Sequence, residues 1–439
     1  MRTRQLAISI SLALLAIAEF CSAQAPQGRS RAMSQRLTSG SREITIAEAS
    51  SPFGDEPVIA EEFSPLDELG CDPGSFCCMS ATPCSPSVCG RLYAAADYLL
   101  WWTDSMNLPP LVTTSPAGTP LNVAGILDQA GTQVLVGGEF GDGSKSGGRV
   151  NVGWWLDPQQ CQSLEVGYFA LGTRSTHFAA SSANNPILAR PVFDTATNTE
   201  AAMLVAHPNL LVGGINVDAS TDLHGAELLF RRCVLDICDR RLDFLVGYRF
   251  AQLEDHLLVR QSSQFIAPQG NIIIGTTRDL FDRFDTDNRF HGGEFGVELH
   301  QKMNCWSLDL LGKVALGRTV TDVVIDGRTT NTVPNVGAAT FVGGLLAQQT
   351  NIGTFERDSF AVVPELRALL TRDLTCNLRF SFGYNLIYWS TVLRAGDQID
   401  RNVSQFPPTA PAGTRQPAFR PQSQGLFVQG LHLGLEYQF

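Results

Sequence analysis

Two stretches of this sequence carry residue types that could bind a phosphate group or a metal ion. The first is the glycine-rich segment GGEFGDGSKSGG at 137–148. A phosphate loop of the G-x-x-x-x-G-K-[ST] type needs a glycine directly before its lysine and a helix after it. Here Ser144 precedes Lys145, and the residues that follow predict a strand. We therefore interpret the segment as a flexible hairpin loop.

The second stretch is DRFDTDNRF, in which Asp282, Asp285 and Asp287 could offer carboxylate oxygens to a calcium ion. It lacks the glycine and the distal glutamate of a known calcium loop. The seven histidines of the chain are scattered, and no serine, histidine and acidic residue share a recognisable catalytic motif. We predict no metal, no cofactor and no catalytic residue.

Charged residues recur in a regular pattern on predicted strands. In RVNVGWWL, Val150, Val152 and Trp154 share one face, and Arg149 and Asn151 lie on the other. A period of two indicates a β-strand with one apolar and one polar face. Ten segments between residues 91 and 439 follow this pattern. The charges predicted to line the lumen of a barrel are Asp97, Arg149, Glu165, Glu227, Asp243, Arg249, Glu294, Glu298, Asp309, Lys313, Glu365, Arg367, Arg379 and Glu436.

The connections between these strands alternate between long and short, which is typical of an up-and-down outer-membrane barrel. A soluble domain with so many long loops is disfavoured. We predict an all-β, transmembrane antiparallel β-barrel of about 10–12 strands with long outer loops. The segments NIII at 271–274 and TVTDVVID at 319–326 either extend strands or form loop hairpins. The long connections are 103–148, 172–222, 253–289, 318–359 and 390–424, and the short ones are 157–161, 233–239, 302–305 and 371–376.

The apolar face of the strands is predicted to contact lipid, because lipid offers no partner for a charge. A closed barrel leaves no unpaired backbone in lipid, so the last strand must pair with the first. That last strand is apolar at alternate positions up to its final residue, like the C-terminal signal of bacterial outer-membrane proteins. The predicted partners are outer-membrane lipid and the barrel-insertion machinery. The predicted signal residues are Leu431, Leu433, Leu435, Tyr437 and Phe439.

The N-terminus has the layout of a secretory signal peptide. Arg2 and Arg4 precede the apolar run from Leu6 to Ala18, which is too short to span a bilayer as a helix, and cleavage is favoured after Ala23. The formal net charge of −11 argues against nucleic acid as a partner. The predicted divisions are a signal peptide at 1–23, a disordered linker at 24–70, a Cys-rich periplasmic segment at 71–90 and the barrel at 91–439.

Cysteines of an exported chain are expected to form disulfides. Five lie in the Cys-rich segment and five in the predicted short turns, so both groups belong to one end of the barrel. We hypothesise that disulfides tie the segment to the barrel base, with a metal cluster or unpaired thiols as alternatives. The candidates are Cys71, Cys77, Cys78, Cys84, Cys89, Cys161, Cys233, Cys238, Cys305 and Cys376.

The sequence resembles β-barrel porin family seven over roughly 90–439. The resemblance implies a barrel in the bacterial outer membrane, whereas the family name only presumes a pore. It rests on DYLLWW at 97–102, SGGRVNVGWWLD at 146–157, LEVGYFALG at 164–172, FDTDNRFHGGEFGVE at 284–298, GDQIDRN at 396–402 and VQGLHLGLEYQF at 428–439.

Three functions follow from these observations. The charged inner face favours a porin that passes small hydrophilic solutes through a narrow lumen. The long outer loops favour a structural or surface-interaction barrel without an open pore. An enzyme is the weakest of the three hypotheses. The oligomeric state stays unknown.

Overall fold

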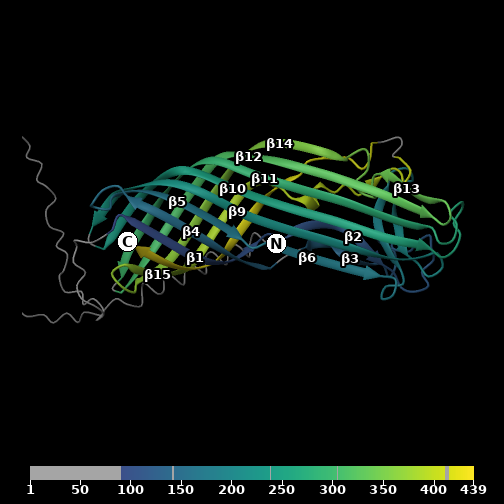
Figure 1. Ribbon diagram of the computed structural model, residues 1–439, viewed down its shortest axis with the longest axis horizontal. Helices are drawn as coiled ribbons and strands as arrows, with labels where there is room; N and C mark the ends of the chain where they lie inside the picture. Colours follow the sequence, from purple (N-terminus) through teal and green to yellow (C-terminus); the bar gives the residue numbers. More distant parts are fainter. Residues whose placement is uncertain (1–89, 141–142, 238, 304, 411–414) are drawn as a thin grey trace, which may run out of the picture. The chain divides into compact units, whose positions relative to one another are not determined.

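The computed structural model describes residues 90–140, 143–237, 239–303, 305–410 and 415–439. The predicted signal peptide, linker and Cys-rich segment lie outside the described residues, apart from Gly90. In the described part of the chain, ten antiparallel strands pair in a closed ring, which confirms the predicted barrel (Figure 1). No helix among these residues has the length and apolar character to cross a membrane. In spatial order the ring consists of β9 (Leu211–Ile237), β10 (Arg240–Phe265), β11 (Thr277–Met303), β12 (Trp306–Val333), β14 (Gly353–Asp373), β15 (Leu378–Leu393), β17 (Ser423–Gln438), β1 (Leu92–Thr103), β4 (Ser144–Trp155) and β5 (Gln162–Leu171).

The outer surface of the ring is apolar, as expected of a wall that contacts lipid. Val150, Val152 and Trp154 of β4 are exposed, and Arg149 and Asn151 between them are buried. The same alternation holds on β17, where Leu433 and Leu435 are exposed and His432 is buried. The ring closes where β17 pairs with both β15 and β1. Every strand therefore has a partner on each side, and the barrel has no free edge within its apolar belt.

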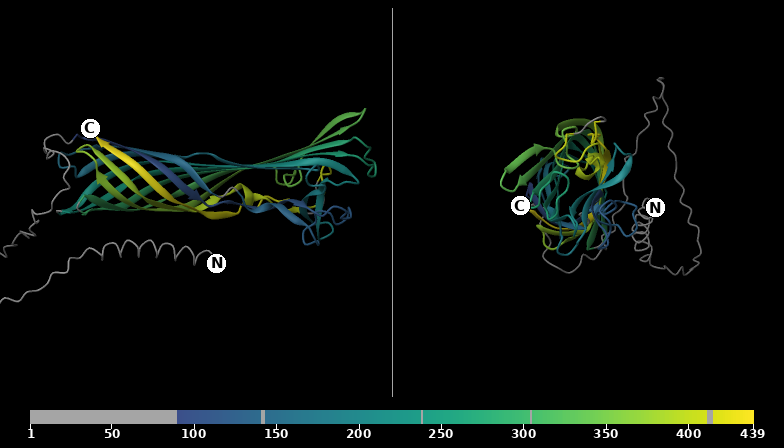
Figure 2. Two further views of the ribbon diagram at one scale, coloured as in Figure 1. Left: turned by 90° about the horizontal axis from the view of Figure 1, so that it is seen from below. Right: turned by 90° about the vertical axis from the view of Figure 1, so that its right-hand side faces the viewer.

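Strands β9 to β12 continue far beyond the ring (Figure 2). Their two faces exchange character on the way. On β10 the outward residues up to Phe250 are apolar, whereas four of the next five on the same face are polar, namely Gln252, Glu254, His256 and Arg260, with Leu258 as the exception. The inward residues become apolar at the same level. The outward face thus changes from one suited to lipid to one suited to water.

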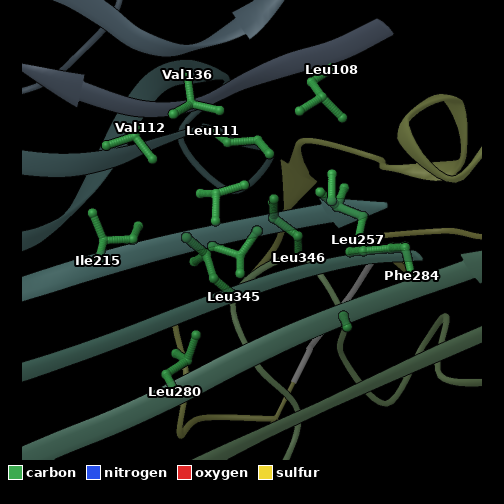
Figure 3. Close-up of a cluster of buried hydrophobic side chains, with 14 of the residues drawn as sticks. Leu108, Leu111, Val112, Val136, Ile215, Leu257, Leu280, Phe284, Leu345 and Leu346 are labelled. Carbon is green, nitrogen blue, oxygen red and sulfur yellow. The ribbon is translucent and has the colours of Figure 1, made fainter. Parts of the chain in front are cut away.

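A second sheet lies at this outer end of the molecule, with strand order β16-β7-β2-β3 and β8 paired to β7. Its side chains pack against the inward faces of β9 to β12 in one core cluster (Figure 3). The cluster includes Leu111 and Val112 together with Ile215 and Leu346. The remaining elements are β2 (Met106–Thr114), β3 (Gln133–Phe140), β6 (Arg174–Ser181), β7 (Leu188–Asp194), β8 (Thr199–Ala206), β13 (Gly337–Val342), the 3-10 helix η1 (Ala395–Gln398) and β16 (Asn402–Val403).

The long connections are therefore not the plain outer loops of the sequence-based prediction. Most of 211–222, 253–265 and 277–289 is strand, because inward apolar residues there bury against the second sheet. The segment 319–326 extends β12, whereas 271–274 lies in the loop between β10 and β11. Strand β6 pairs with β9 and β13 with β12, outside the ring. The short connections lie at the opposite end and are tighter than predicted, because β9 continues to Ile237, β11 to Met303 and β14 to Asp373.

Candidate functional site

The barrel interior holds a group of six charged side chains at its centre, which we call the central charge layer. Five of them lie on the consecutive ring strands β9, β10, β11, β12 and β14. The sixth, Arg149, comes from β4, and it meets Glu365 of β14 across the interior. The layer is electrically balanced, with three cations and three carboxylates. Its members are Arg149, Glu227, Arg249, Glu294, Lys313 and Glu365.

Glu365 and Lys313 link most of this layer. The Glu365 carboxylate lies 2.7 Å from the Arg249 guanidinium, 3.4 Å from Arg149 and 3.6 Å from the Lys313 ammonium. Lys313 also lies 2.5 Å from Glu227 and 3.5 Å from Glu294, and Arg249 pairs with Glu294 at 2.9 Å. The three carboxylates alone could hold a metal ion. The Lys313 ammonium lies within 3.6 Å of all three and supplies a positive charge to them.

A second charge layer lies nearer the short turns and centres on Arg231. Its guanidinium pairs with Glu165 at 3.2 Å, with Asp243 at 3.0 Å and with Glu298. Arg367 lies 3.6 Å from Glu298. Arg231 is not among the predicted lumen charges, although it shares the inward face of its strand with Glu227. Extending the alternation of that strand by four residues would have found it.

The other predicted lumen charges also have partners. His432 contacts the Asp97 carboxylate at 3.0 Å, and His300 contacts Asp309. Arg379 pairs with Asp373 at 2.9 Å and with Glu436 at 3.8 Å. Sequence reasoning missed both histidines because it treated histidine only as a catalytic or metal-binding residue. Their inward register was readable from the strand alternation.

An apolar layer fills the barrel interior on the outer side of the central charge layer. It contains Trp101 and Leu99 from β1, Phe290 from β11 and Trp389 from β15, all 2% exposed or less. Nine of the ten ring strands contribute to this cluster. The Arg149 guanidinium lies 5.5 Å from the centre of the Trp101 ring, so the two layers are in contact. The interior at this level resembles a protein core rather than an aqueous channel.

Buried polar contacts join the loop after β15 to the barrel wall above the apolar layer. Arg394, directly after β15, binds the Asp255 carboxylate with two nitrogens, and both side chains are 2% exposed or less. The Asn288 amide donates to the carbonyl of Leu393 at 2.8 Å and accepts from its N–H at 2.8 Å. This loop therefore covers the outer side of the layer and is held by charge-assisted hydrogen bonds.

The two motifs considered for ligand chemistry have other roles. Lys145 lies in β4, and its ammonium donates to the Thr221 carbonyl at 2.9 Å. Asp282 is buried against Arg190 at 2.6 Å, whereas Asp285 binds His256 at 3.1 Å on the other face of β11. Asp287 accepts a hydrogen bond from Gln252. The three aspartates are thus not brought together, and a calcium loop is not formed.

The predicted signal residues lie on the closing strand. Leu433, Leu435, Tyr437 and Phe439 are exposed on the outer surface, and Leu431 is half-buried. The rings of Tyr437 and Phe439 are 4.9 Å apart, and the Phe439 N–H donates to the carbonyl of Leu92 in β1. The last residue therefore takes part in closing the ring.

The cysteines among the described residues gather at the short-turn end. Cys161 lies between β4 and β5, Cys233 near the end of β9, Cys305 between β11 and β12, and Cys376 between β14 and β15. The Cys233 N–H donates to the Cys161 carbonyl at 2.7 Å, and neither of these two cysteines is in a disulfide. Cys238 and the five cysteines at 71–89 lie outside the described residues.

Solved outer-membrane barrels resemble the chain only distantly. Outer membrane protease OmpT from Escherichia coli shares 10% identity with a TM-score of 0.36, over 81% of this chain and 100% of that one. A mutant of the TodX monoaromatic hydrocarbon channel shares 8% with a TM-score of 0.20, over 81% and 92%. A FadL homologue from Pseudomonas aeruginosa shares 7% with a TM-score of 0.23, over 80% and 90%. No curated protein matches the chain.

A family model described as "Putative beta barrel porin-7" matches residues 93–439, which include all ten strands of the ring except the first residue of β1. This range covers most of the chain and agrees with the barrel and its apolar outer wall. The chain is therefore a member of the beta barrel porin-7 family of outer-membrane proteins.

Proposed function

We propose that this outer-membrane barrel is a closed anchor that holds its outer sheets at the cell surface, and that it is neither an open diffusion pore nor an enzyme. One observation carries the proposal. The interior is filled by two charge layers and an apolar layer in which Leu99, Trp101 and Phe290 are buried. Barrels of about eight strands are filled by side chains, and only those of about sixteen or more leave a broad channel.

The outer part of the chain supports a role at the surface. Four ring strands extend beyond the apolar belt, and a second sheet packs on their inner faces. A diffusion pore needs no such assembly over its mouth, whereas a surface-interaction protein needs a rigid platform there. The narrow-lumen porin is the alternative, and it requires solutes to pass both charge layers and the apolar layer.

Solute passage can be measured by swelling of liposomes that contain the purified protein. We expect liposomes diluted into an isotonic pentose solution to swell no faster than protein-free liposomes. The control is a wide trimeric porin reconstituted at the same ratio of protein to lipid. Rapid swelling with this protein would favour the narrow-lumen porin over the closed anchor.

The proposed orientation places the short turns in the periplasm and the extended strands outside. Val336, between β12 and β13, is 80% exposed at the outer end. A membrane-impermeant maleimide should label the Val336→Cys variant on intact cells. It should not label the wild type, whose described cysteines all lie at the short-turn end. Labelling of wild-type protein on intact cells would show that the orientation is reversed.

A further inference from the structure

A hollow of about 790 Å³ lies on the outward face of the extended sheet, far from the barrel interior. Strands β6, β9, β10, β11 and β12 form its floor, and the residues after β6 form one wall. Its volume is within the range of small-molecule sites in proteins. The core cluster on the opposite face of the same strands fixes the floor, because Ile215 and Leu280 point into that core (Figure 3).

Strand register places an aromatic ring between two guanidinium groups on this floor. Arg260 of β10 pairs with Phe281 of β11, and Phe281 pairs with Arg328 of β12. Asn216 of β9 pairs with Arg260 and continues the row. Side chains of directly paired residues lie on the same face of a sheet, about 5 Å apart. The floor therefore offers one apolar surface with a cation on each side.

Phe281 differs from its neighbours on the outward face of β11. Between Phe281 and the membrane, this face carries polar side chains, among them Arg283, Asp287, Arg289 and His291. An aromatic side chain on a face that is otherwise suited to water contributes little to the stability of the fold. A flat apolar ring among polar groups is suited to the face of a sugar ring, whose hydroxyl groups need hydrogen-bonding neighbours.

The two arginines are available for an anion. Arg260 has only a loose contact with Asp218, at 3.8 Å between exposed side chains. Arg328 has no carboxylate within 4.0 Å among the residues that the structure describes. The hollow also contains the Asp279 carboxylate, whose oxygens can accept hydrogen bonds from hydroxyl groups. In a chain with a net charge of −11, two such cations on one concave surface are suited to a carboxylate or sulfate ligand.

The position of the hollow decides between two sources of an acidic sugar. Arg260 lies ten residues beyond Phe250, where the continuous run of apolar outward residues on β10 ends, which is about 33 Å along the strand. Sugars attached to lipids beside the barrel start at the membrane surface, well below this level. A free polysaccharide in the external medium reaches the hollow without this restriction.

We propose that this hollow binds a short stretch of an acidic polysaccharide, with Phe281 stacked on a sugar ring and Arg260 and Arg328 paired with its acidic groups. Asn216 and Asp279 would hydrogen bond to the hydroxyl groups. The inference rests on the proposed function, because it requires the extended strands to face the medium. It assigns an acidic polysaccharide as the ligand of the extended sheet.

The test is isothermal titration calorimetry, in which three tetrasaccharides are titrated into the full-length protein in lipid nanodiscs. Tetragalacturonate and a sulfated carrageenan tetrasaccharide are the acidic probes, and maltotetraose is the neutral control. At least one acidic probe should bind the wild type more tightly than maltotetraose does, and its affinity should fall as salt is raised. The Arg260→Gln/Arg328→Gln double variant should bind it at least about tenfold more weakly, and Phe281→Ala should also weaken it.

The matched control is Arg318→Gln, which removes an exposed arginine from the outward face of β12 outside the hollow. It should bind like the wild type. The proposal would be overturned if neither acidic probe bound, if salt had no effect on the wild type, or if the double variant bound as tightly as Arg318→Gln. The titration does not depend on the lumen or on orientation in cells, so its failure is distinguishable from failure of the closed anchor.

Discussion

At the scale of single residues, Glu365 is the side chain on which the central charge layer most depends. It contacts three cations and is 1% exposed. Glu365→Gln would leave Arg149, Arg249 and Lys313 with two carboxylates between them. Because an unbalanced buried charge is costly, we expect the free energy of unfolding to fall by about 3–5 kcal/mol.

Urea unfolding of the refolded barrel in lipid vesicles measures this loss. The matched control is Arg318→Gln, which breaks the exposed pair of Arg318 with Asp358 on the outside of the same barrel. Exposed pairs contribute little, so the control should unfold close to the wild type. Equal unfolding midpoints for Glu365→Gln and the wild type would argue against an ion-pair layer that packs the interior.

His256, on the outer part of β10, provides a pH-dependent contact outside the membrane. The hydrogen bond with Asp285 raises the pKa of His256 above its ordinary value. A raised histidine pKa stabilises the fold below the unfolded-state pKa, and this contribution is lost as pH rises through the folded-state pKa. In Asp285→Asn the pKa of His256 should return toward its ordinary value, as measured by NMR titration of the ring. An unchanged midpoint would contradict this assignment.

At the scale of elements, the closing strand was predictable from sequence and the outer extensions were not. The alternation from Leu431 to Phe439 is unbroken, so it predicted a strand there, and the structure confirms this strand and its two faces. On β10 the apolar positions move from even to odd residues near Ala251. That change of phase was interpreted as the end of a strand, whereas it marks the passage from lipid to water.

The charges on the inner face were predictable as a group, but their contacts were not. Alternation alone places Arg249, Lys313 and Glu365 on one face. Their meeting depends on strand tilt and on the order of strands around the ring, which a single sequence does not contain. The second sheet was missed because its strands are short and irregular, and one pairs in parallel with a two-residue partner.

The terminal residue is expected to decide whether the barrel assembles. Phe439 is exposed on the lipid side, and its N–H donates to Leu92 across the closure. Phe439→Asp would add a charge to the lipid face of the closing strand, so we expect the heat-modifiable barrel to be lost from the outer membrane.

Gln438→Asp adds the same charge one residue earlier, on the opposite face of the strand, and should assemble. Electrophoresis of outer-membrane fractions with and without heating separates folded from unfolded protein for both variants. Folded Phe439→Asp at the wild-type level would rule out the recognition signal.

The cysteines at the short-turn end are predicted to form disulfides in the mature protein. Cys161 and Cys233 are neighbours across β5 and β9, so oxidation in the periplasm should join these two thiols or join them to the segment at 71–89. Non-reducing peptide mapping of protein purified from the envelope identifies the bridges. Ten alkylatable thiols would reject the model, and so would bridges that never join two turns or a turn with the segment at 71–89.

At the scale of the whole molecule, the account rests on a barrel whose interior is packed rather than open. Buried charges join β4, β10, β12 and β14 inside the barrel. Nearer the outer end, the buried side chains of the apolar layer fill the interior. In the proposed function the barrel is an anchor, and the extended strands provide the interaction surface. This proposal requires that no continuous aqueous path crosses the barrel.

Conductance of the purified protein in a planar lipid bilayer tests this claim most directly. We expect no stable steps on the nanosiemens scale of wide trimeric pores. A wide porin recorded under the same salt and voltage shows that insertion can be detected. Stable nanosiemens steps from the wild-type protein would contradict a closed barrel.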